Sequence, residues 1–575
     1  MNFTKAPDAK HKLDLIKNLR NNDSIKLVPL DKGNGIAVLN TDDYYTKLNA
    51  IIDSDKFAKV TFLDDEMLLH HPIVKQQNKL KCYLNKHVKP HVDCKTFDFI
   101  NPIGSNCGKL YGTAKVHKQG TPLRPIVASH GTSEYNLAKY LNQFITPIID
   151  TEFSVQSNSQ LIDAISKYQF SPDSKLVSFD IENLFTNVPM DETINIACEK
   201  VYNGDGLKPP FNQDVFRNLL KFATGGIFSF NDTLYVQRDG LAMGSPLAPT
   251  LSNLFVGSLE RKYLKQSCRN VKFYARYVDD ILVMFEDDDH STFLDYINSW
   301  HDNLKFTVEI GMKSIPFLDI NLDIESNVVN TTVYRKPTYT NLVLNYAACC
   351  PLQWKRGLLL TLINRAYVVC NSWLNFHNEI DKLSHIFKAN GYPSSFILDT
   401  TKKFLDKKFS NPSVKSDQSY SHVVKIPFFG QQSLFFKKRL QSIFNRIDPD
   451  SKVRWVFTCT KLKSYFSNKD RTPLMLKSGV VYCFTCEVDP RFTYIGKTLR
   501  HLNIRVKEHK SKISAIFDHR LNCSCRCNPE NFKILASDSD GFALNIKEAF
   551  YIKKLSPKLN KQVKFDGSFY NCRLF

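Results

Sequence analysis

Apolar residues along the chain follow two different spacings, and the changes between them divide it into segments. Residues 13–19, LDLIKNL, have helical spacing and precede a Gly-containing turn at 31–35. From about 96 to 345, short apolar runs alternate with helix-length amphipathic segments, as in an α+β domain. Residues 350–410 have helical spacing again, and residues 478–486, SGVVYCFTC, predict a strand that opens a last unit.

Between these units, residues 411–475 are rich in Ser, Lys and Asp, which indicates a connector with some structure. One apolar and basic stretch within it suits either template binding, by stacking and charge, or a helix docked between domains. Its aromatic and cationic side chains are Phe428, Phe429, Phe435, Phe436, Lys437, Lys438 and Arg439.

The size and charge of the chain narrow the class of protein. A length of 575 residues exceeds one compact core, so we expect three or more folding units. The net charge of +20 suits a polyanionic partner, although excess charge also serves solubility. No stretch has the length and apolarity of a signal peptide or a membrane span, so we expect neither. The 15 cysteines are then expected as reduced thiols or metal ligands.

Three carboxylates interrupt segments that otherwise predict strands. KFYARYVDDILVMF predicts a hairpin with Asp279 and Asp280 at its tip, and KLVSFDIENLF predicts another strand, which carries Asp180. Adjacent carboxylates in apolar surroundings are costly unless a cation neutralises them. Converging from two strands, they suit two Mg²⁺ (or Mn²⁺) ions about 3.5–4 Å apart. Any one of them alone is equally well explained as a solvated loop charge.

The order of the segments adds a resemblance. FDIENLF, GLAMGSPLAP and YVDD resemble palm motifs A, B and C of reverse transcriptases, and KLYGTAKVHKQGTPLRPIVAS resembles their fingers. FTVEIGMKSIPFLDINL and VYRKPTYT resemble the late palm and primer-grip regions. This resemblance implies a right-hand polymerase with fingers, palm and thumb. It also implies that Arg124 contacts the incoming triphosphate and that Phe185 excludes a ribose 2′-hydroxyl. The other substrate-binding residues that it implies are Lys32, Lys115, Gly244, Ser245 and Tyr277.

A second constellation lies near the C-terminal end of the sequence. Tyr482 and Tyr494 fall on two apolar strands about one hairpin apart, and Arg505 and His509 share a helix face at i,i+4. An amphipathic helix with Glu548 follows, and Asn560 comes just after it. The pattern is similar to that of GIY-YIG nucleases, with the departure that its first element reads Val-Val-Tyr.

That second resemblance implies a small α/β nuclease domain. Glu548 is then expected to bind one divalent metal (Mg²⁺), Tyr482 to help activate water, and Arg505 to stabilise the phosphate. Tyr494, His509 and Asn560 are expected to support the site. The alternative is a small basic domain in which the tyrosines only fill the core.

Cysteines cluster in the same region. Cys483 and Cys486 form a CxxC, and His519 lies just before a further group at 523–527. These residues predict a structural zinc site with Cys483, Cys486, His519 and Cys523 as ligands. Packed free thiols are the alternative, and His509 is an alternative ligand.

The combination of both parts resembles the Penelope-like retroelements, and VPLDKGNGIAVLNTDDYY also resembles a segment of that family. We therefore divide the chain into five parts: an N-terminal region with the start of the fingers (1–95), fingers and palm (96–345), a helical thumb (346–410), a basic linker (411–475) and the nuclease domain (476–575).

The family resemblance implies target-primed reverse transcription, in which the protein nicks DNA and extends the freed 3′-hydroxyl on its RNA. Template RNA, primer and target DNA and dNTPs are the expected partners, with no membrane. A nuclear location follows from the need for chromosomal DNA. Two other classes stay open: a repair or junction nuclease on a non-catalytic polymerase-like scaffold, and a non-enzymatic RNA-binding protein.

Overall fold

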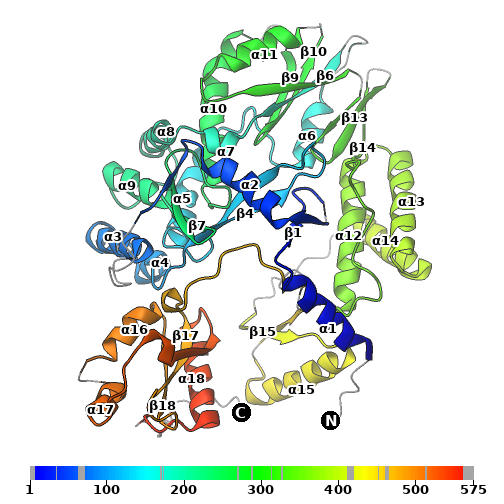
Figure 1. The fold of residues 1–575 in the computed structure, drawn as a ribbon. Coiled ribbons are helices and arrows are strands. Elements are labelled where there is room, and N and C mark those ends of the chain that lie inside the picture. Colours follow the sequence, from blue (N-terminus) through cyan, green and yellow to red (C-terminus); the bar gives the residue numbers. More distant parts are fainter. Residues whose placement is uncertain are drawn as a thin grey trace.

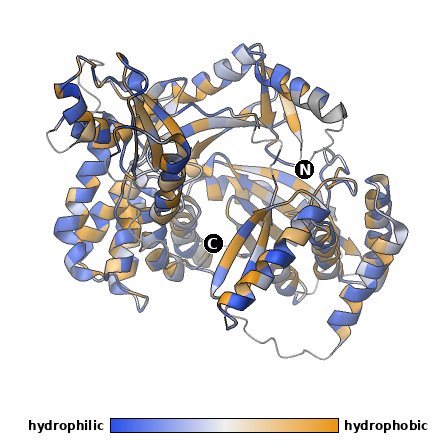
Figure 2. Ribbon diagram, turned by 90° about the horizontal axis from the view of Figure 1, so that it is seen from below, coloured by the Kyte–Doolittle hydropathy of each residue, from blue (hydrophilic) through white to orange (hydrophobic). Residues whose placement is uncertain are grey.

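The computed structural model describes residues 7–33, 35–61, 71–168, 171, 174–267, 271–286, 289–312, 314–325, 328–410, 420–450, 452–459, 461, 465–511 and 514–560. Figure 1 shows a large upper body and, below it, two smaller units. In Figure 2 the sheets carry long hydrophobic stretches, whereas the helices carry hydrophobic and hydrophilic stretches side by side. Among the described residues, no helix combines the length and apolarity that crossing a membrane requires.

The first part of the large body is built on a five-stranded sheet in the order β3-β8-β7-β4-β5. A hairpin of β1 and β2 precedes it, and its turn at 31–35 includes residue 34, which lies outside the described residues. Val28, Tyr44, Leu48, Leu110 and Phe228 form the core. The elements are α1 (Pro7–Arg20), β1 (Ile25–Pro29), β2 (Ile36–Asn40), α2 (Thr41–Ile52), β3 (Phe57–Lys59), α3 (Pro72–His87), α4 (Cys94–Ile100), β4 (Gly108–Ala114), β5 (Leu123–Ala128), β7 (Ile227–Phe230) and β8 (Thr233–Gln237).

The second part is an antiparallel sheet in the order β11-β6-β10-β9, and it carries the predicted hairpin. Its alternate residues pack on two sides. Val177 and Phe179 face helices in the largest core, whereas Leu176 and Leu282 face a three-stranded sheet, β12-β13-β14. The elements are α5 (Tyr135–Ile145), α6 (Asn158–Ile165), β6 (Lys175–Ile181), α7 (Leu184–Asn187), α8 (Met190–Asn203), α9 (Gln213–Thr224), α10 (Ala248–Ser267), β9 (Val271–Tyr277), β10 (Asp280–Phe285), α11 (His290–Asn298), β11 (Phe306–Met312), β12 (Ser314–Phe317), β13 (Ile320–Glu325) and β14 (Val328–Val333).

The helices predicted for 350–410 are confirmed. They are α12 (Leu352–Val369), α13 (Trp373–Ala389) and α14 (Ser394–Phe409), and they pack around Leu359, Phe376, Leu383 and Phe387. In Figure 1 they stand at the right edge of the large body.

The connector holds more regular structure than its composition indicates. Residues 411–419 lie outside the described part, but β15 (His422–Pro427) and β16 (Val453–Thr458) pair in parallel and flank α15 (Gln431–Ile447). The apolar and basic stretch is therefore the end of a strand and a helix. The rings of Phe429, Phe435 and Phe436 nevertheless stay exposed.

The last unit is a three-stranded antiparallel sheet in the order β18-β17-β19. Its elements are β17 (Val480–Thr485), β18 (Thr493–Thr498), α16 (Leu502–Glu508), α17 (Ala515–Leu521), β19 (Phe532–Ser537) and α18 (Gly541–Leu555). Tyr482, Phe484 and Phe532 lie in the core on one face of the sheet, and Val481, Ile495 and Leu544 pack on the other.

Direct contacts join this unit to the five-stranded sheet. His501 Nε2 lies 2.8 Å from the carbonyl oxygen of Ser105, and Lys109 Nζ donates to the carbonyl oxygen of Asp470 at 2.6 Å. Leu476 packs with Ile73 in one apolar cluster. The segment leading into the last unit is therefore anchored on the first part of the large body.

Candidate functional site

The predicted acidic turn is observed between β9 and β10. Tyr277 pairs with Asp280 across the hairpin, which leaves Val278 and Asp279 as the two turn residues. Val278 has φ of 58°, a left-handed conformation that is strained for a β-branched side chain. Tyr277 is 38% exposed beside the turn. Such a backbone persists only where neighbouring groups hold it.

Arg276 supplies that support from inside the protein. Its guanidinium is 0% exposed and forms two hydrogen bonds with Glu260 on α10, at 2.6 and 2.9 Å. Its Nη1 also donates to Asn253 Oδ1 at 2.8 Å and to the carbonyl oxygen of Val278 at 3.0 Å. The pairing of Arg276 with Glu260 was not predicted from the sequence. Its only signal was one arginine inside the apolar run KFYARY.

Asp180 lies directly beside the turn. It is the register partner of Asp280 between β6 and β10, and the N–H of Ile181 donates to the carbonyl oxygen of Asp279 at 3.0 Å. Burial and the Asp279 charge raise the pKa of Asp180. Burial and the other two aspartates raise the pKa of Asp280 to about 6. Crowded carboxylates with raised pKa values fit a site for hard divalent cations.

A cationic group faces the aspartates from the β1–β2 turn and β4–β5. Lys32 interacts electrostatically with Asp180 and Asp280, and also with Lys115, whose pKa is lowered by burial and by Arg124. The predicted cations are therefore brought together on this side. Lys336, which sequence reasoning missed, joins them: burial and Lys32 lower its pKa to about 8.

Arg124 has a carboxylate partner that the sequence did not reveal. Asp31 Oδ1 lies 3.1 Å from Arg124 Nε, and the Asp31 side chain is 4% exposed. The backbone N–H of Asp31 donates to the carbonyl oxygen of Ala114 at 2.9 Å, so the turn is docked on β4. The N-terminal hairpin thus restrains the guanidinium.

The glycine loop before α10 is docked on β5. Gly244 has φ of 126°, and a Cβ there would lie 2.1 Å from the carbonyl oxygen of Val127. The N–H of Val127 donates to the carbonyl oxygen of Met243, and Ser245 follows in the same loop. At the other end of the loop, the N–H of Leu241 donates to the carbonyl oxygen of Phe185, whose ring packs on the large core. The close approach of Gly244 to the Val127 carbonyl oxygen is possible because glycine has no Cβ.

The predicted nuclease residues also come together. The Tyr482 hydroxyl lies 2.7 Å from His509 Nε2 and accepts a hydrogen bond from Arg505 Nε at 3.2 Å. The Tyr494 ring lies beside Tyr482, at 6.5 Å between centroids. A Cβ at Gly496 would lie 2.6 Å from the Tyr482 hydroxyl, so the close packing of the two tyrosines requires that glycine.

Burial shifts the pKa values of two ionisable side chains in this second site, His509 and Glu548. Burial, with Arg505, lowers the pKa of His509 to about 4, so its imidazole is neutral between Tyr482 and Ser514. Burial raises the pKa of Glu548, while Lys497 and Arg505 oppose that rise.

Asn560, which follows α18 in the chain, is hydrogen-bonded to the backbone of β18. Its side-chain amide accepts from the N–H of Ile495 at 2.9 Å and donates to the carbonyl oxygen of the same residue at 2.8 Å. This double contact holds the strand that carries Tyr494.

A tight metal-ligand group lies in the same unit, and it corrects one predicted ligand. The ligand atoms of Cys486, His519, Cys523 and Cys525 all lie within 4.8 Å of one another. Cys483 is not among them, because side chains alternate along β17 and it packs on the opposite face from Tyr482. Cys525 takes its place.

The chemistry of this group fits a metal. Burial raises the pKa of Cys486, but the N–H of Asp489 and the side chains of His519 and Cys523 bring it down to about 7. Among the described residues, His519 Nε2 is buried and has no hydrogen-bond partner. A thiolate and an unpaired imidazole nitrogen are ligands that zinc prefers.

Parts of the chain are similar to known proteins. Residues 342–402 match the family model of the animal helix-turn-helix domain, which coincides with α12, α13 and much of α14. No curated protein matches the chain. Among solved structures, telomerase from Candida albicans in complex with a fragment of telomeric RNA has 12% identity and a TM-score of 0.45, covering 71% of this chain and 73% of that one. The sicinivirus 3Dpol RNA-dependent RNA polymerase has 12% identity and a TM-score of 0.37, covering 70% and 87%.

The second family model covers the acidic site itself. Residues 116–311 match the model of reverse transcriptase (RNA-dependent DNA polymerase). The matched range contains Arg124 and all three clustered aspartates, Asp180, Asp279 and Asp280. The match shows that this region of the chain is similar to reverse transcriptases.

Proposed function

We propose that the protein is an RNA-directed DNA polymerase that also carries a DNA endonuclease. The polymerase part rests chiefly on the register pairing of Asp180 with Asp280, beside Asp279, within the matched range. The donor set fits Mg²⁺ or Mn²⁺, which when bound lower the pKa of a primer 3′-hydroxyl and neutralise charge on the transferred phosphate.

The chain's own residues position the substrates in this proposal. Arg124 holds the triphosphate with its planar fork, and Lys32 and Lys115 add positive charge beside it. Phe185 excludes a ribose 2′-hydroxyl. The Gly244–Ser245 loop brings backbone close to the new base pair.

Primer extension of oligo(dT) on poly(A) tests this activity. Wild type should extend with Mg²⁺ or Mn²⁺, and Asp280→Asn should lower the rate about a thousandfold or more, because a metal ligand is lost. Asp302→Asn, at an exposed site outside the turn, should retain activity. No extension by wild type with either ion would refute the proposal.

The nuclease part is favoured by the contacts among Tyr482, His509 and Arg505, with Glu548 close by. The arrangement supports a GIY-YIG-type site, in which Glu548 holds one divalent metal and Arg505 stabilises the phosphate. Glu548→Gln should abolish nicking of supercoiled DNA, and Glu530→Gln, exposed in the same unit, should not. Equal nicking by wild type and Glu548→Gln would remove Glu548 from the mechanism.

We also propose that this unit binds a structural zinc ion, with Cys486, His519, Cys523 and Cys525 as ligands. Metal analysis of the purified protein should find one zinc in wild type and in Cys483→Ser. Cys525→Ser should lose it. Loss of zinc from Cys483→Ser but not from Cys525→Ser would instead support Cys483 as the ligand, as the sequence predicted.

Together the two activities support a Penelope-like element protein that performs target-primed reverse transcription in the nucleus. The wild type should join new cDNA covalently to the nicked strand of target DNA. Asp280→Asn should nick without extension, and Glu548→Gln should do neither on intact DNA. A repair or junction nuclease on an inactive scaffold predicts the same products for wild type and Asp280→Asn.

A further inference from the structure

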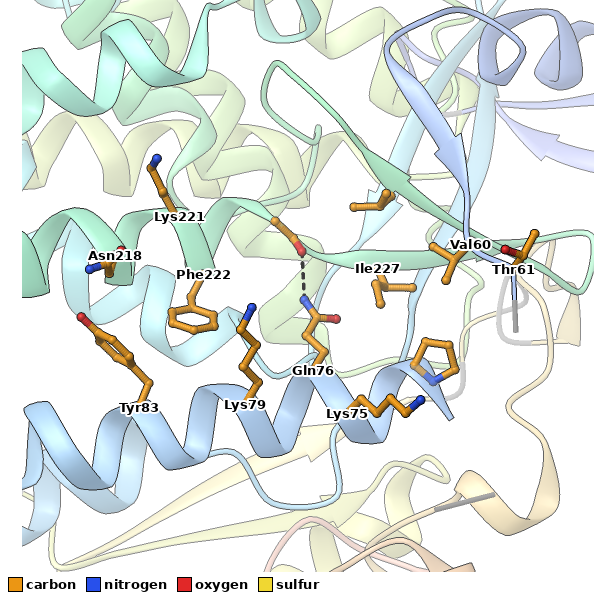
Figure 3. A pocket seen from close by; sticks show the side chains of 13 residues that line it. Val60, Thr61, Lys75, Gln76, Lys79, Tyr83, Asn218, Lys221, Phe222 and Ile227 are labelled. Carbon is orange, nitrogen blue, oxygen red and sulfur yellow. Dashed lines mark hydrogen bonds between the residues drawn. The ribbon is translucent and has the colours of Figure 1, made fainter. Parts of the chain in front are cut away.

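A cavity of about 860 Å³ lies outside both sites, between α3 and α9. Figure 3 shows the side chains of Lys75, Lys79 and Tyr83 on α3, with Phe222 pointing toward them from α9. Gln76 donates to the carbonyl oxygen of Gly225 at 2.9 Å and ties the two sides together. We call it the α3–α9 cavity.

The cavity is positively charged. Lys75 and Lys79 are four residues apart on one helix face, and Lys221 lines the cavity from the second helix with its amine pointing away from them. Among the described residues that line the cavity, none is acidic. Lys221 lies 3.4 Å from Asp191, but that carboxylate is 90% exposed, so the pair is weak. An anionic ligand is the natural complement of this surface.

Aromatic rings lie among these cations. The Tyr83 and Phe222 rings are 5.3 Å apart, and Tyr83 is 4.6 Å from the ring of His87 along α3. Tyr83 and Phe222 are only half-buried, so their faces are within reach of a ligand. Asn218 adds an amide at the same wall. Lysines for phosphates interleaved with rings for bases are the pattern by which proteins hold single strands.

We propose that the α3–α9 cavity binds a segment of single-stranded nucleic acid, with a base against Phe222 and Tyr83 and neighbouring phosphates on Lys75 and Lys79. A duplex does not fit this chemistry, because its bases are stacked away from protein rings. The wall residues Val60 and Ile227 belong to the apolar cluster that includes Leu476, just before the nuclease unit. A strand held there lies beside the junction of the two units.

The test is a binding experiment that needs neither enzymatic activity. Fluorescence anisotropy compares a 5′-labelled U12 RNA, a T12 DNA and a DNA duplex. Lys75→Gln/Lys79→Gln should bind both single strands about tenfold more weakly than wild type. Its salt dependence should fall by about 0.7 in log–log slope for each lost phosphate contact. Lys81→Gln/Lys86→Gln removes the same charge from α3 outside the cavity and should match wild type.

Cross-linking locates the bound strand. U12 RNA with 5-iodouridine, added after the polymerase site is filled with primer–template, should cross-link to peptides of α3 or α9. Cross-links only elsewhere, or equal loss of affinity in the two double variants, would overturn the proposal. Competition by free UMP at equal phosphate concentration would instead assign a mononucleotide site. If the protein passes these binding tests but does not extend a primer, the proposed polymerase function fails while the single-strand site stands.

Discussion

At the scale of single residues, the acidic turn depends on Arg276, whose charged side chain is fully buried. Arg276 holds the strained Val278 peptide and is itself paired with the Glu260 carboxylate. Removing one partner of such a buried pair leaves the other charge uncompensated, which costs far more than losing a surface pair.

Glu260→Gln should therefore lower the free energy of unfolding by about 3–5 kcal/mol, measured by urea denaturation. Glu286→Gln breaks the exposed pair with Lys272, also on β9, and should cost less than about 1 kcal/mol. Similar small losses in both variants would show that water reaches Arg276.

Asp31 is the second residue whose importance comes from its partner. It is nearly buried and lies 3.1 Å from Arg124. Asp31→Asn should raise the KM for dNTP about tenfold with a smaller change in kcat, because the guanidinium loses its charged restraint. Asp43→Asn, in a partly exposed pair with Lys47, is the control and should leave KM unchanged. An unaltered KM in Asp31→Asn would mean that β4 and β5 alone position Arg124.

At the scale of elements, the sheet of the last unit depends on close approach between two strands. Gly496 on β18 faces Tyr482 on β17, with room for no Cβ. The neighbouring contacts from His509 and Arg505 then converge on the same hydroxyl.

Gly496→Ala should therefore displace Tyr482 and reduce nicking about a hundredfold, since misplacements near 1 Å have such effects. Gly357→Ala on α12 meets nothing within 4 Å and should leave nicking intact. It should also stabilise the protein by about 0.5–1 kcal/mol, because alanine favours a helix. Unchanged nicking in Gly496→Ala would argue against a role for the tyrosine hydroxyl.

At the scale of the whole molecule, a buried histidine lies where the last unit meets the first part of the large body. His501 is fully buried, with Nε2 facing the Ser105 carbonyl oxygen, and its Nδ1 has no hydrogen-bond partner among the described residues. Burial lowers the pKa of His501, and burial together with His501 lowers the pKa of His71 nearby. Both imidazoles are thus held neutral.

Because the folded pKa of His501 lies below the unfolded value, docking is favoured above about pH 6.5 and weakens as pH falls through the folded pKa. Amide hydrogen exchange in residues 470–478, corrected for its intrinsic pH dependence, should accelerate between pH 7.5 and 5.5. His501→Gln keeps a donor for Ser105 and should flatten that dependence. The same acceleration in this variant would assign the effect to another group.

Local pattern was enough to predict much of this molecule. The hairpin around Asp279 and Asp280 and the helices of 350–410 follow from short-range apolar spacing, and both are observed. Tyr482, Arg505 and His509, which the sequence predicts to share one site, also lie in contact, because they sit on neighbouring elements of one small unit. The parallel β15–β16 pair was not foreseen, since its strands are separated by a helix and lie in a polar stretch.

The sequence by itself determined which chemical groups the chain carries: three carboxylates in strand-like segments, an arginine before Pro-Ile, and a tyrosine–arginine–glutamate set. Only the tertiary structure decided which partners hold them. Asp31 reaches Arg124 and Glu260 reaches Arg276 through contacts that no local spacing encodes. Cys525, and not Cys483, lies in the candidate metal-ligand group, because the alternation of β17 turns Cys483 away. Spacing along the chain sets which face a side chain takes, whereas packing between distant segments sets what it meets there.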